Sequence, residues 1–183
     1  MTSSEPNAPT TGAMEIKFHT REELHLDLED AVDVQSALRL FFVFRLAGVD
    51  DLNSKVGEAV AEVLLNEAAN SIAVTIGPRA IYYRPRRDEL CGLVAGNLHG
   101  AEQTLVTTLA RLNDEHRAIG LTAGFGAVIL PREASTVDGA VSLADQRVAG
   151  VVDRSTPVIR GGSALDRGLG RAVLRRTSDA HAA

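Results

Sequence analysis

Arginines and carboxylates concentrate in residues 84–90 (RPRRDEL), where three arginines precede an Asp-Glu pair. Planar guanidinium groups donate paired hydrogen bonds to phosphate oxygens or to the edge of a guanine base. Carboxylates beside them can ligate a divalent cation or pair with an arginine. The segment therefore predicts either a site for an anionic ligand or a solvated turn with a local positive patch.

The other residue types that could bind metals or catalyse reactions form no known motif. The five histidines lack metal-ligand spacing with one another and with Cys91, the single cysteine. The sequence has no nucleophile elbow, phosphate-binding Gly-Lys-Ser/Thr loop or dinucleotide glycine fingerprint. Cys91 sits in an apolar run, so we expect a buried, reduced thiol that packs as a small hydrophobe. We therefore expect no cofactor and no bound metal.

Length and composition predict one domain of ordinary size. The chain has 183 residues, 45% of them apolar, which suffices for one compact core and is too little for two ordinary domains. Its 19 basic and 24 acidic residues give a net charge of −5, which argues against general binding to nucleic acid or to an anionic membrane. The start of the chain lacks the basic and apolar stretches of a signal peptide. We therefore expect a cytoplasmic protein that binds neither nucleic acid nor membrane.

The two ends of the chain differ in character from its centre. Residues 1–13 and 153–183 are polar and lack sustained periodicity, so we expect a disordered N-terminus and a flexible C-terminal tail. The tail holds six arginines against three aspartates, a mild positive excess that could dock on an acidic partner or remain solvated. The folded domain is predicted at residues 14–152.

Periodicity predicts alternating helices and strands in residues 14–152. Thr20 and Glu23 have the spacing of a capping box before a first helix. Residues 38–46 form a β-branched and aromatic run, typical of a central strand buried on both faces. Helical spacing predicts a helix over about residues 49–69. The apolar positions of its expected buried face are Val49, Leu52, Val56, Val60, Val63 and Leu64.

The sequence of the second half of the domain predicts a β-hairpin between helices. The expected strands are residues 71–76, 79–84, 89–95 and 121–130, with an exposed charged turn at 85–88. Apolar residues spaced by three or four predict a helix over residues 98–112, and Ser135 with Asp138 could cap a last helix that runs to Val152. This order of elements favours an α/β (α+β) fold, with helices packed on a central mixed or antiparallel sheet.

Four blocks of sequence, in order, carry a resemblance to a known family. They are residues 44–53 (FRLAGVDDLN), Gly57 with Glu62, residues 84–90 (RPRRDEL), and residues 143–148 (LADQRV) after the strand 122–126 (TAGFG). Together they resemble the GGDEF domain of diguanylate cyclases, over about residues 38–152. The resemblance implies a nucleotidyl-cyclase palm with a β-hairpin at the signature motif. The family joins two GTP molecules into cyclic di-GMP, so it also implies bacterial signalling.

The resemblance assigns roles to individual positions. Asn53 matches the family's guanine-binding Asn, and Glu62 matches the acid that contacts the guanine edge. Asp88 and Glu89 match the acidic pair of the signature, and Asp88 is the only retained metal-ligand position. Arg45 stands where the family has its first metal-binding Asp, which puts a permanent positive charge there. We therefore expect Arg45 to form an ion pair with Asp88.

Other departures remove further parts of the cyclase site. Arg86 and Arg87 replace both signature glycines, which lack a Cβ and so let the turn take positive φ and approach the nucleotide. Their long side chains would project into the volume of ribose and phosphate, although a guanidinium could also bind phosphate. The family's product-inhibition motif would fall on residues 77–80, which lack its Arg and Asp in register. Its phosphate-contacting Lys and preceding Tyr correspond to Val152 and Ala149.

These departures predict a loss of catalysis. Magnesium prefers several oxygen ligands, which Asp88 alone does not supply. We expect a catalytically inactive GGDEF-like domain that acts as a regulatory or protein-interaction module in cyclic di-GMP-type signalling. Its expected partner is an unknown protein or a second copy of the chain.

Two alternatives stay open at the level of sequence. One is a metal-independent receptor for a guanine nucleotide or cyclic di-GMP, in which Asn53 and Glu62 read the base while the arginines hold the phosphates. In that case a guanine nucleotide would be a weak ligand. The other is a residual diguanylate cyclase that makes cyclic di-GMP from GTP.

Overall fold

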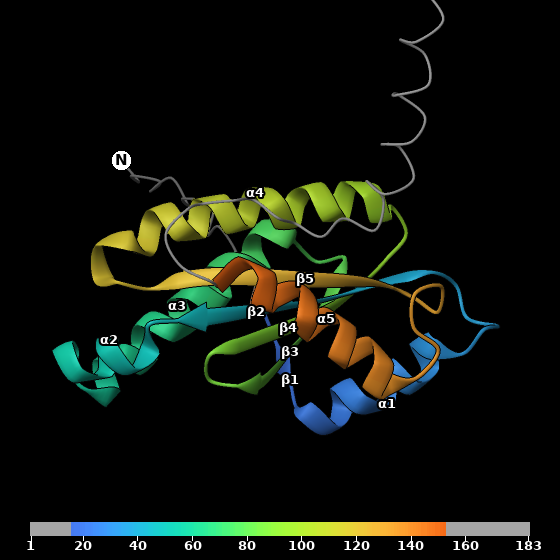
Figure 1. The fold of residues 1–183 in the computed structure, drawn as a ribbon, viewed down its shortest axis with the longest axis horizontal. Helices are drawn as coiled ribbons and strands as arrows, with labels where there is room; N and C mark the ends of the chain where they lie inside the picture. The colour runs from blue at the N-terminus through green and yellow to red at the C-terminus, as the bar shows by residue number, and fades with distance from the viewer. Residues whose placement is uncertain (1–15, 153–183) are drawn as a thin grey trace, which may run out of the picture.

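The computed structural model describes residues 16–152, which form a mixed five-stranded sheet with helices on both faces (Figure 1). Its strands are β1 (Phe18–His19), β2 (Arg39–Ala47), β3 (Ala80–Arg86), β4 (Glu89–Ala95) and β5 (Thr122–Leu130), in the order β1-β3-β4-β2-β5. β1 is parallel to β3, and the other neighbours are antiparallel. The predicted α+β fold class is confirmed. The expected disordered N-terminus (1–13) and flexible tail (153–183) lie outside the described residues.

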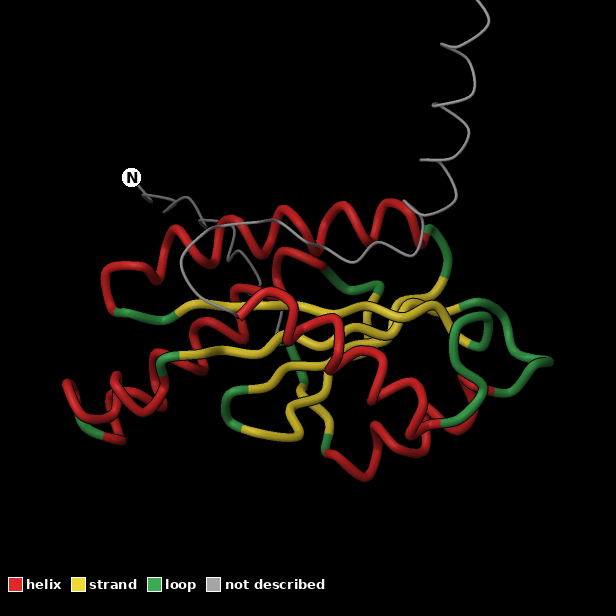
Figure 2. Tube along the Cα trace, in the orientation of Figure 1, coloured by secondary structure: helices red, strands yellow, loops and turns green. Residues whose placement is uncertain are grey.

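Helices form a layer on each side of the sheet. They are α1 (Arg21–Val32), α2 (Val49–Val56), α3 (Glu58–Ile76), α4 (Leu98–His116) and α5 (Val137–Val152), with a 3-10 turn at Arg117–Ile119. α3 and α4 pack on one face and α1 and α5 on the other, so a hydrophobic cluster forms on each side. In Figure 2 the strands, in yellow, run side by side between the helices.

β2 is the central strand that its sequence predicts. Phe42 and Phe44 pack on the α3–α4 side, whereas Phe41 and Val43 pack on the α1–α5 side. Successive side chains of a strand alternate between faces, and all four of these are at most 2% exposed. β2 also pairs along both edges, with β4 and with β5.

The single helix predicted for residues 49–69 is two helices. Gly57 separates α2 from α3 with a φ of 83°, in the left-handed region that glycine adopts readily. α3 then continues to Ile76, so the strand predicted for residues 71–76 is wrong. The β-branched residues of that segment suggested a strand, but its buried residues continue the helical spacing of α3.

The predicted buried face of this region is also partly wrong. Leu52 is buried, but Val56, Val60 and Val63 are 40%, 51% and 55% exposed. α3 instead buries mainly alanines, which let the helix pack closely on the core. By length and composition α3 is apolar enough to cross a membrane, a property that it shares with the core helices of many proteins.

The predicted helix caps agree with the structure in part. The capping box forms, since Thr20 N donates to Glu23 Oε2 at 2.7 Å and Glu23 N donates to Thr20 Oγ1 at 3.2 Å. The first of these bonds is the main cause that lowers the pKa of Glu23 to about 2. α5 is capped by Thr136, whose Oγ1 accepts from Gly139 N at 3.1 Å, and not by Ser135.

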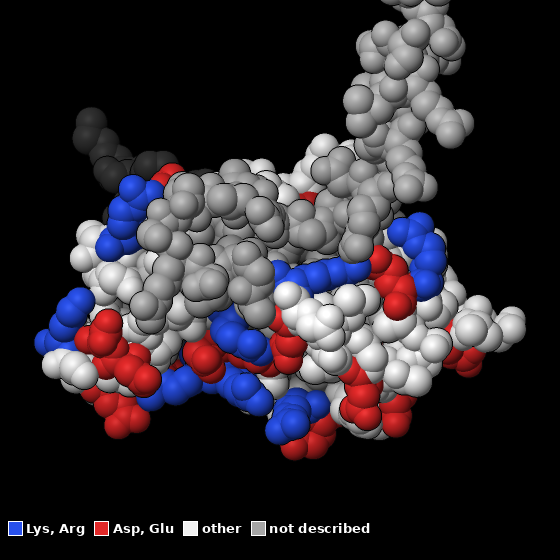
Figure 3. All heavy atoms as spheres, in the orientation of Figure 1, with Lys and Arg blue, Asp and Glu red and all other residues white. Residues whose placement is uncertain are grey.

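Charges are mixed on the surface of the domain. On the face shown in Figure 3, blue basic and red acidic side chains lie next to one another and do not separate into large patches of one sign. This distribution agrees with the small net charge of −5.

Candidate functional site

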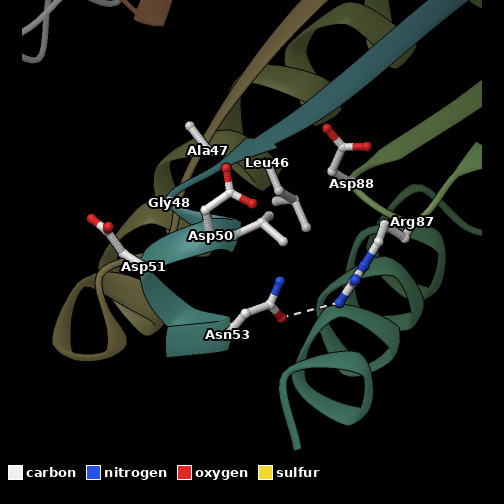
Figure 4. A pocket seen from close by; sticks show the side chains of 9 residues that line it. Leu46, Ala47, Gly48, Asp50, Asp51, Asn53, Arg87 and Asp88 are labelled. Carbon is white, nitrogen blue, oxygen red and sulfur yellow. Dashed lines mark hydrogen bonds between the residues drawn. The ribbon is translucent and has the colours of Figure 1, made fainter. Parts of the chain in front are cut away.

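Three segments meet at one end of the sheet, where the sequence predicted a ligand site. β2 leads through Gly48 into α2, and the β3–β4 hairpin turns beside them. The turn consists of Arg87 and Asp88, shorter than the predicted tip at residues 85–88. These segments line a pocket of about 560 Å³ (Figure 4). Its lining residues are Leu46, Ala47, Gly48, Val49, Asp50, Asp51, Asn53, Arg87 and Asp88.

Gly48 determines how β2 turns into α2. Its φ is 90°, and a Cβ at this position would lie 2.3 Å from the carbonyl oxygen of Gly120. Any other residue would therefore meet both backbone strain and a collision with backbone. The tight turn starts α2, which carries Asn53, directly at the edge of the pocket.

Arg87 is the residue around which the predicted base-reading positions gather. Its Nη2 donates to Asn53 Oδ1 at 3.2 Å, and its Nη1 donates to Glu58 Oε1 at 3.4 Å. Its buried Nε lies 3.4 Å from Glu62 Oε2, an ion-pair contact without hydrogen-bond geometry. Figure 4 shows the Arg87 side chain extending from the turn to Asn53, while Asp51 points away from it. The structure thus brings Asn53 and Glu62 together on one guanidinium.

Arg84, on strand β3, contacts both Glu62 and the backbone of Arg87. Its Nη2 lies 3.3 Å from Glu62 Oε1 and donates to the carbonyl oxygen of Arg87 at 2.9 Å. Its Nη1 donates to Asn66 Oδ1. Only 16% of the Arg84 side chain is exposed, so this arginine is part of the structure of the hairpin. Glu62 therefore contacts two arginines at once.

Arg45 does not pair with Asp88, so that expectation is wrong. Its Nη2 donates to Glu89 Oε2 at 2.9 Å and to Asp145 Oδ1 at 2.8 Å. Burial alone would lower the pKa of Arg45, but the hydrogen bond to Glu89 and the charge of Asp145 outweigh it and raise that pKa. The physical reason is strand alternation: Arg45 pairs in register with Glu89 on β4, and both face α5.

Asp88 and Glu89 lie in different surroundings although they are adjacent. The Asp88 carbonyl oxygen accepts from Leu46 N at 2.8 Å, and its side chain lines the pocket with Asp50 and Asp51. Glu89 lies with Arg45 and is 13% exposed. Within residues 16–152 no group of three or more His, Cys, Asp or Glu side chains has the geometry to hold a metal ion.

The arginines of the hairpin do not form one patch. Arg86 is 62% exposed and lies 4.0 Å from Glu89, on the Arg45 side. Arg79 precedes β3 and lines a separate pocket near Asn97. The alternative of a solvated positive turn is therefore wrong for Arg84 and Arg87, which are held by their neighbours, and fits Arg86 alone. The predicted substitutions at Ala149 and Val152 fall on side chains outside those that the structure describes.

Sequence reasoning missed three partners of these arginines. Glu58 begins α3, Asn66 lies two turns further along that helix, and Asp145 lies on α5. Asp145 lies in the block 143–148 that resembles the family, and this resemblance could have predicted its position near the hairpin. No sequence pattern pointed to Glu58 and Asn66, because each becomes a partner only when α3 packs beside the hairpin.

A family model confirms the resemblance. The model of the diguanylate cyclase GGDEF domain matches residues 17–152, which is most of the chain. The chain therefore belongs to the GGDEF family. A search of curated protein sequences found no match.

Solved structures with the same fold support this assignment. The GGDEF domain of YfiN from Pseudomonas aeruginosa aligns with a TM-score of 0.61 at 16% identity, over 73% of this chain and 89% of that one. The active GGEEF domain of a Vibrio cholerae diguanylate cyclase aligns with 0.63 at 12% identity, over 74% and 91%. The GGDEF domain of DgcB from Caulobacter crescentus, in complex with c-di-GMP, aligns with 0.60 at 14% identity, over 82% and 92%. At these identities the likeness concerns the fold.

Proposed function

We propose that this chain is a catalytically inactive GGDEF domain that acts as a regulatory or protein-interaction module in bacterial, cyclic di-GMP-type signalling. We place it in the cytoplasm, with an unknown protein or a second copy as its partner. The observation that carries the proposal is the position of Arg87. Its guanidinium contacts Asn53 and Glu62, the two residues that the family resemblance assigns to guanine.

The guanidinium of Arg87 resembles the edge of guanine that such residues would read. Both groups present N–H donors in one plane around a carbon bonded to three nitrogens, and Asn53 and Glu62 offer oxygen acceptors. An entering base would have to displace Arg87 from both residues. Losing the hydrogen bond between the charged Arg87 and Asn53 costs about 1.5–3 kcal/mol, and the ion-pair contact with Glu62 would be lost as well, so Arg87 competes with an entering base.

The residues at the metal positions do not fit divalent cations. Arg45 supplies no oxygen, and its guanidinium is occupied by Glu89 and Asp145. Asp88 alone is too few ligands for magnesium, which prefers several oxygens in octahedral geometry. Attack of a 3′-hydroxyl on an α-phosphate needs that metal charge, so these side chains do not support the cyclase reaction.

The charge of the pocket also disfavours a triphosphate. Asp50, Asp51 and Asp88 line it, and its one arginine is already paired with Glu58 and Glu62. Carboxylates near a phosphate repel it unless a cation lies between them. The pocket is thus suited to neither the base nor the phosphates of GTP.

Product analysis tests the loss of catalysis directly. The full chain would be incubated with GTP and either Mg²⁺ or Mn²⁺, and the mixture analysed by liquid chromatography and mass spectrometry. The active GGEEF domain from Vibrio cholerae is the positive control. We expect no cyclic di-GMP above the protein-free background, and formation of cyclic di-GMP by this chain would overturn the proposal.

A receptor function is the second candidate, and one observation favours it. A pocket of about 560 Å³ lies open beside Asn53, within the size range of ligand sites. Calorimetric titration of the full chain with GTP and with cyclic di-GMP, each with and without Mg²⁺, separates the two candidates. Binding without metal supports the receptor, and no binding supports the interaction module.

A further inference from the structure

A second pocket, of about 470 Å³, lies between α1 and α5 on the other side of β2 from α3 and α4. Its floor is apolar, formed by Phe41, Val43 and Cys91, each at most 2% exposed. The walls are the inner sides of the two helices, with Leu24 and Leu28 on α1 and Val137 and Val141 on α5. A concave site of a few hundred Å³ with an apolar floor is typical of small-molecule pockets.

The packing of the two helices explains where the groove lies. α5 lies tightly on β5, since a Cβ on Gly126 would be 2.1 Å from the carbonyl oxygen of Ala144. α1 packs over β3 on the other side, where Tyr83 donates a hydrogen bond to Asp27. β4 and β2 lie between β3 and β5 in the sheet. α1 therefore sits over β3 and α5 over β5, and the buried side chains of β2 and β4 lie beneath the groove between them.

One end of this groove is charged. Arg86, Glu89 and Arg45 lie in register across β3, β4 and β2, one row beyond the apolar row of Tyr83, Cys91 and Val43. Arg21 also lines the groove at this end, because it follows β1, which runs parallel to β3 toward the hairpin turn. Three arginines and two carboxylates, Glu89 and Asp145, thus surround the end of an apolar trough.

The hydrogen bonds at this end leave cationic donors in excess. Both carboxylates accept from the same nitrogen of Arg45, its Nη2. Among residues 16–152, Nη1 and Nε of Arg45 have no acceptor, and Arg21 forms no ion pair. Arg86 is 62% exposed, with one long contact of 4.0 Å to Glu89. Asp138 lines the opposite end, so an anionic group is favoured only at the arginine end.

We propose that this groove binds a small amphipathic anion, such as an acyl or aryl carboxylate. Its apolar body lies against Val137 and Val141 of α5, above the buried Phe41, Val43 and Cys91, and its acidic group accepts hydrogen bonds from Arg86 and Arg45. This site is independent of the proposed loss of catalysis, since it shares no lining residue with the Arg87 pocket.

Fluorescence titration with 8-anilinonaphthalene-1-sulfonate, an aromatic anion, tests the proposal on the full chain. We expect saturable binding that decanoate displaces and that decanol displaces at least tenfold less well, because the alcohol has no charge for the arginines. Arg86→Ser should weaken binding of the dye about tenfold. The control is Arg117→Ser, which changes an arginine that is 77% exposed and lies outside the groove. This variant should bind the dye as tightly as the wild type does.

A second pair of variants tests the apolar part of the site. Val141→Asp places a carboxylate on the α5 wall of the groove and should abolish dye binding. Because Val141 is 37% exposed, we expect the domain to fold with a polar side chain at this position. Val74→Asp changes a valine on α3 that is 59% exposed and outside the groove, and should have no effect. Absence of saturable binding, equal displacement by decanol, or insensitivity to both Arg86→Ser and Val141→Asp would overturn the proposal.

Discussion

At the scale of the residue, two arginines stand at positions where the family resemblance predicts a carboxylate and a glycine, and their side chains find different partners. Arg45 turns toward α5 and pairs with Glu89 and Asp145. Arg87 turns toward α3 and pairs with Glu58 and Glu62. A guanidinium keeps its charge at any physiological pH, so both arginines supply a permanent positive charge to their neighbouring carboxylates.

A third arginine, Arg147, forms the most buried ion pair of the described chain. Its Nη2 and Nη1 lie 2.9 Å and 3.1 Å from the two carboxylate oxygens of Glu133, and Ile129 N donates to Oε2 at 2.8 Å. The two side chains are only 9% and 17% exposed. Burial alone would raise the pKa of Glu133, but the hydrogen bonds from Arg147 and Ile129 outweigh it and lower that pKa.

We predict that Glu133→Gln lowers the free energy of unfolding by about 2 kcal/mol at pH 7, because it leaves a buried guanidinium without its counter-charge. Gln keeps an acceptor for Ile129 N, so the loss isolates the ion pair. Urea unfolding followed by circular dichroism measures it. The control is Glu115→Gln, in an ion pair with Arg111 whose side chains are 47% and 44% exposed, and should change stability by less than about 1 kcal/mol.

The same pair predicts a dependence on pH. The pKa of Glu133 is lower in the folded chain than its ordinary value of 4.5. Its stabilisation is therefore complete above that value and is lost as pH falls through the folded pKa. The difference in stability between the wild type and Glu133→Gln should shrink below about pH 4.5. A difference that stays constant from pH 7 to pH 3 would contradict this origin.

At the scale of the element, two glycines with positive φ set the geometry of α2. Gly48 and Gly57 bracket this helix with φ of 90° and 83°. A Cβ on Gly48 would meet the backbone of Gly120, whereas a Cβ on Gly57 would have no neighbour within 4 Å. The two positions thus separate backbone strain from steric collision.

We predict that Gly57→Ala destabilises the domain by about 1–3 kcal/mol, the cost of a non-glycine residue at positive φ with extended ψ, and that Gly48→Ala destabilises it by more, because its Cβ also meets the Gly120 carbonyl oxygen. Differential scanning calorimetry of the two variants checks the order. Equal losses, or a larger loss for Gly57→Ala, would show that the contact with Gly120 does not constrain the turn.

The type and spacing of neighbouring side chains predict those elements that depend only on nearby residues. β2 and the capping box at Thr20 follow from side-chain type and spacing over a few residues. The α2–α3 break does not, because Gly57 fits equally well inside a helical pattern, and the apolar spacing across it continues unbroken. The β-branched residues of segment 71–76 predict a strand, but Ile72 and Ala73 continue the buried helical spacing of α3, so the segment is helical.

At the scale of the whole molecule, the sheet separates two sites that share the hairpin. Side chains that leave the turn on the α3 side, such as Arg87, enter the pocket beside Asn53. Those that leave on the α5 side, such as Arg86 and Glu89, end the groove between α1 and α5. The sequence predicted the residues at these positions but not their pairing. Arg87 and Asn53 are 34 residues apart, and only the packing of α2 against the hairpin brings them together.

The most direct test of the account is a calorimetric titration of GTP into the wild type, Arg87→Gly and Arg86→Gly, with ATP as the control ligand. Each variant places a glycine where the family resemblance predicts one, but only Arg87 contacts Asn53 and Glu62. We predict that Arg87→Gly binds GTP about tenfold or more tightly than the wild type does, and that its affinity for ATP is unchanged. Arg86→Gly should bind both nucleotides as the wild type does. Equal affinities of Arg87→Gly and the wild type for GTP, or an equal gain from Arg86→Gly, would contradict the proposal that Arg87 blocks guanine binding at Asn53 and Glu62.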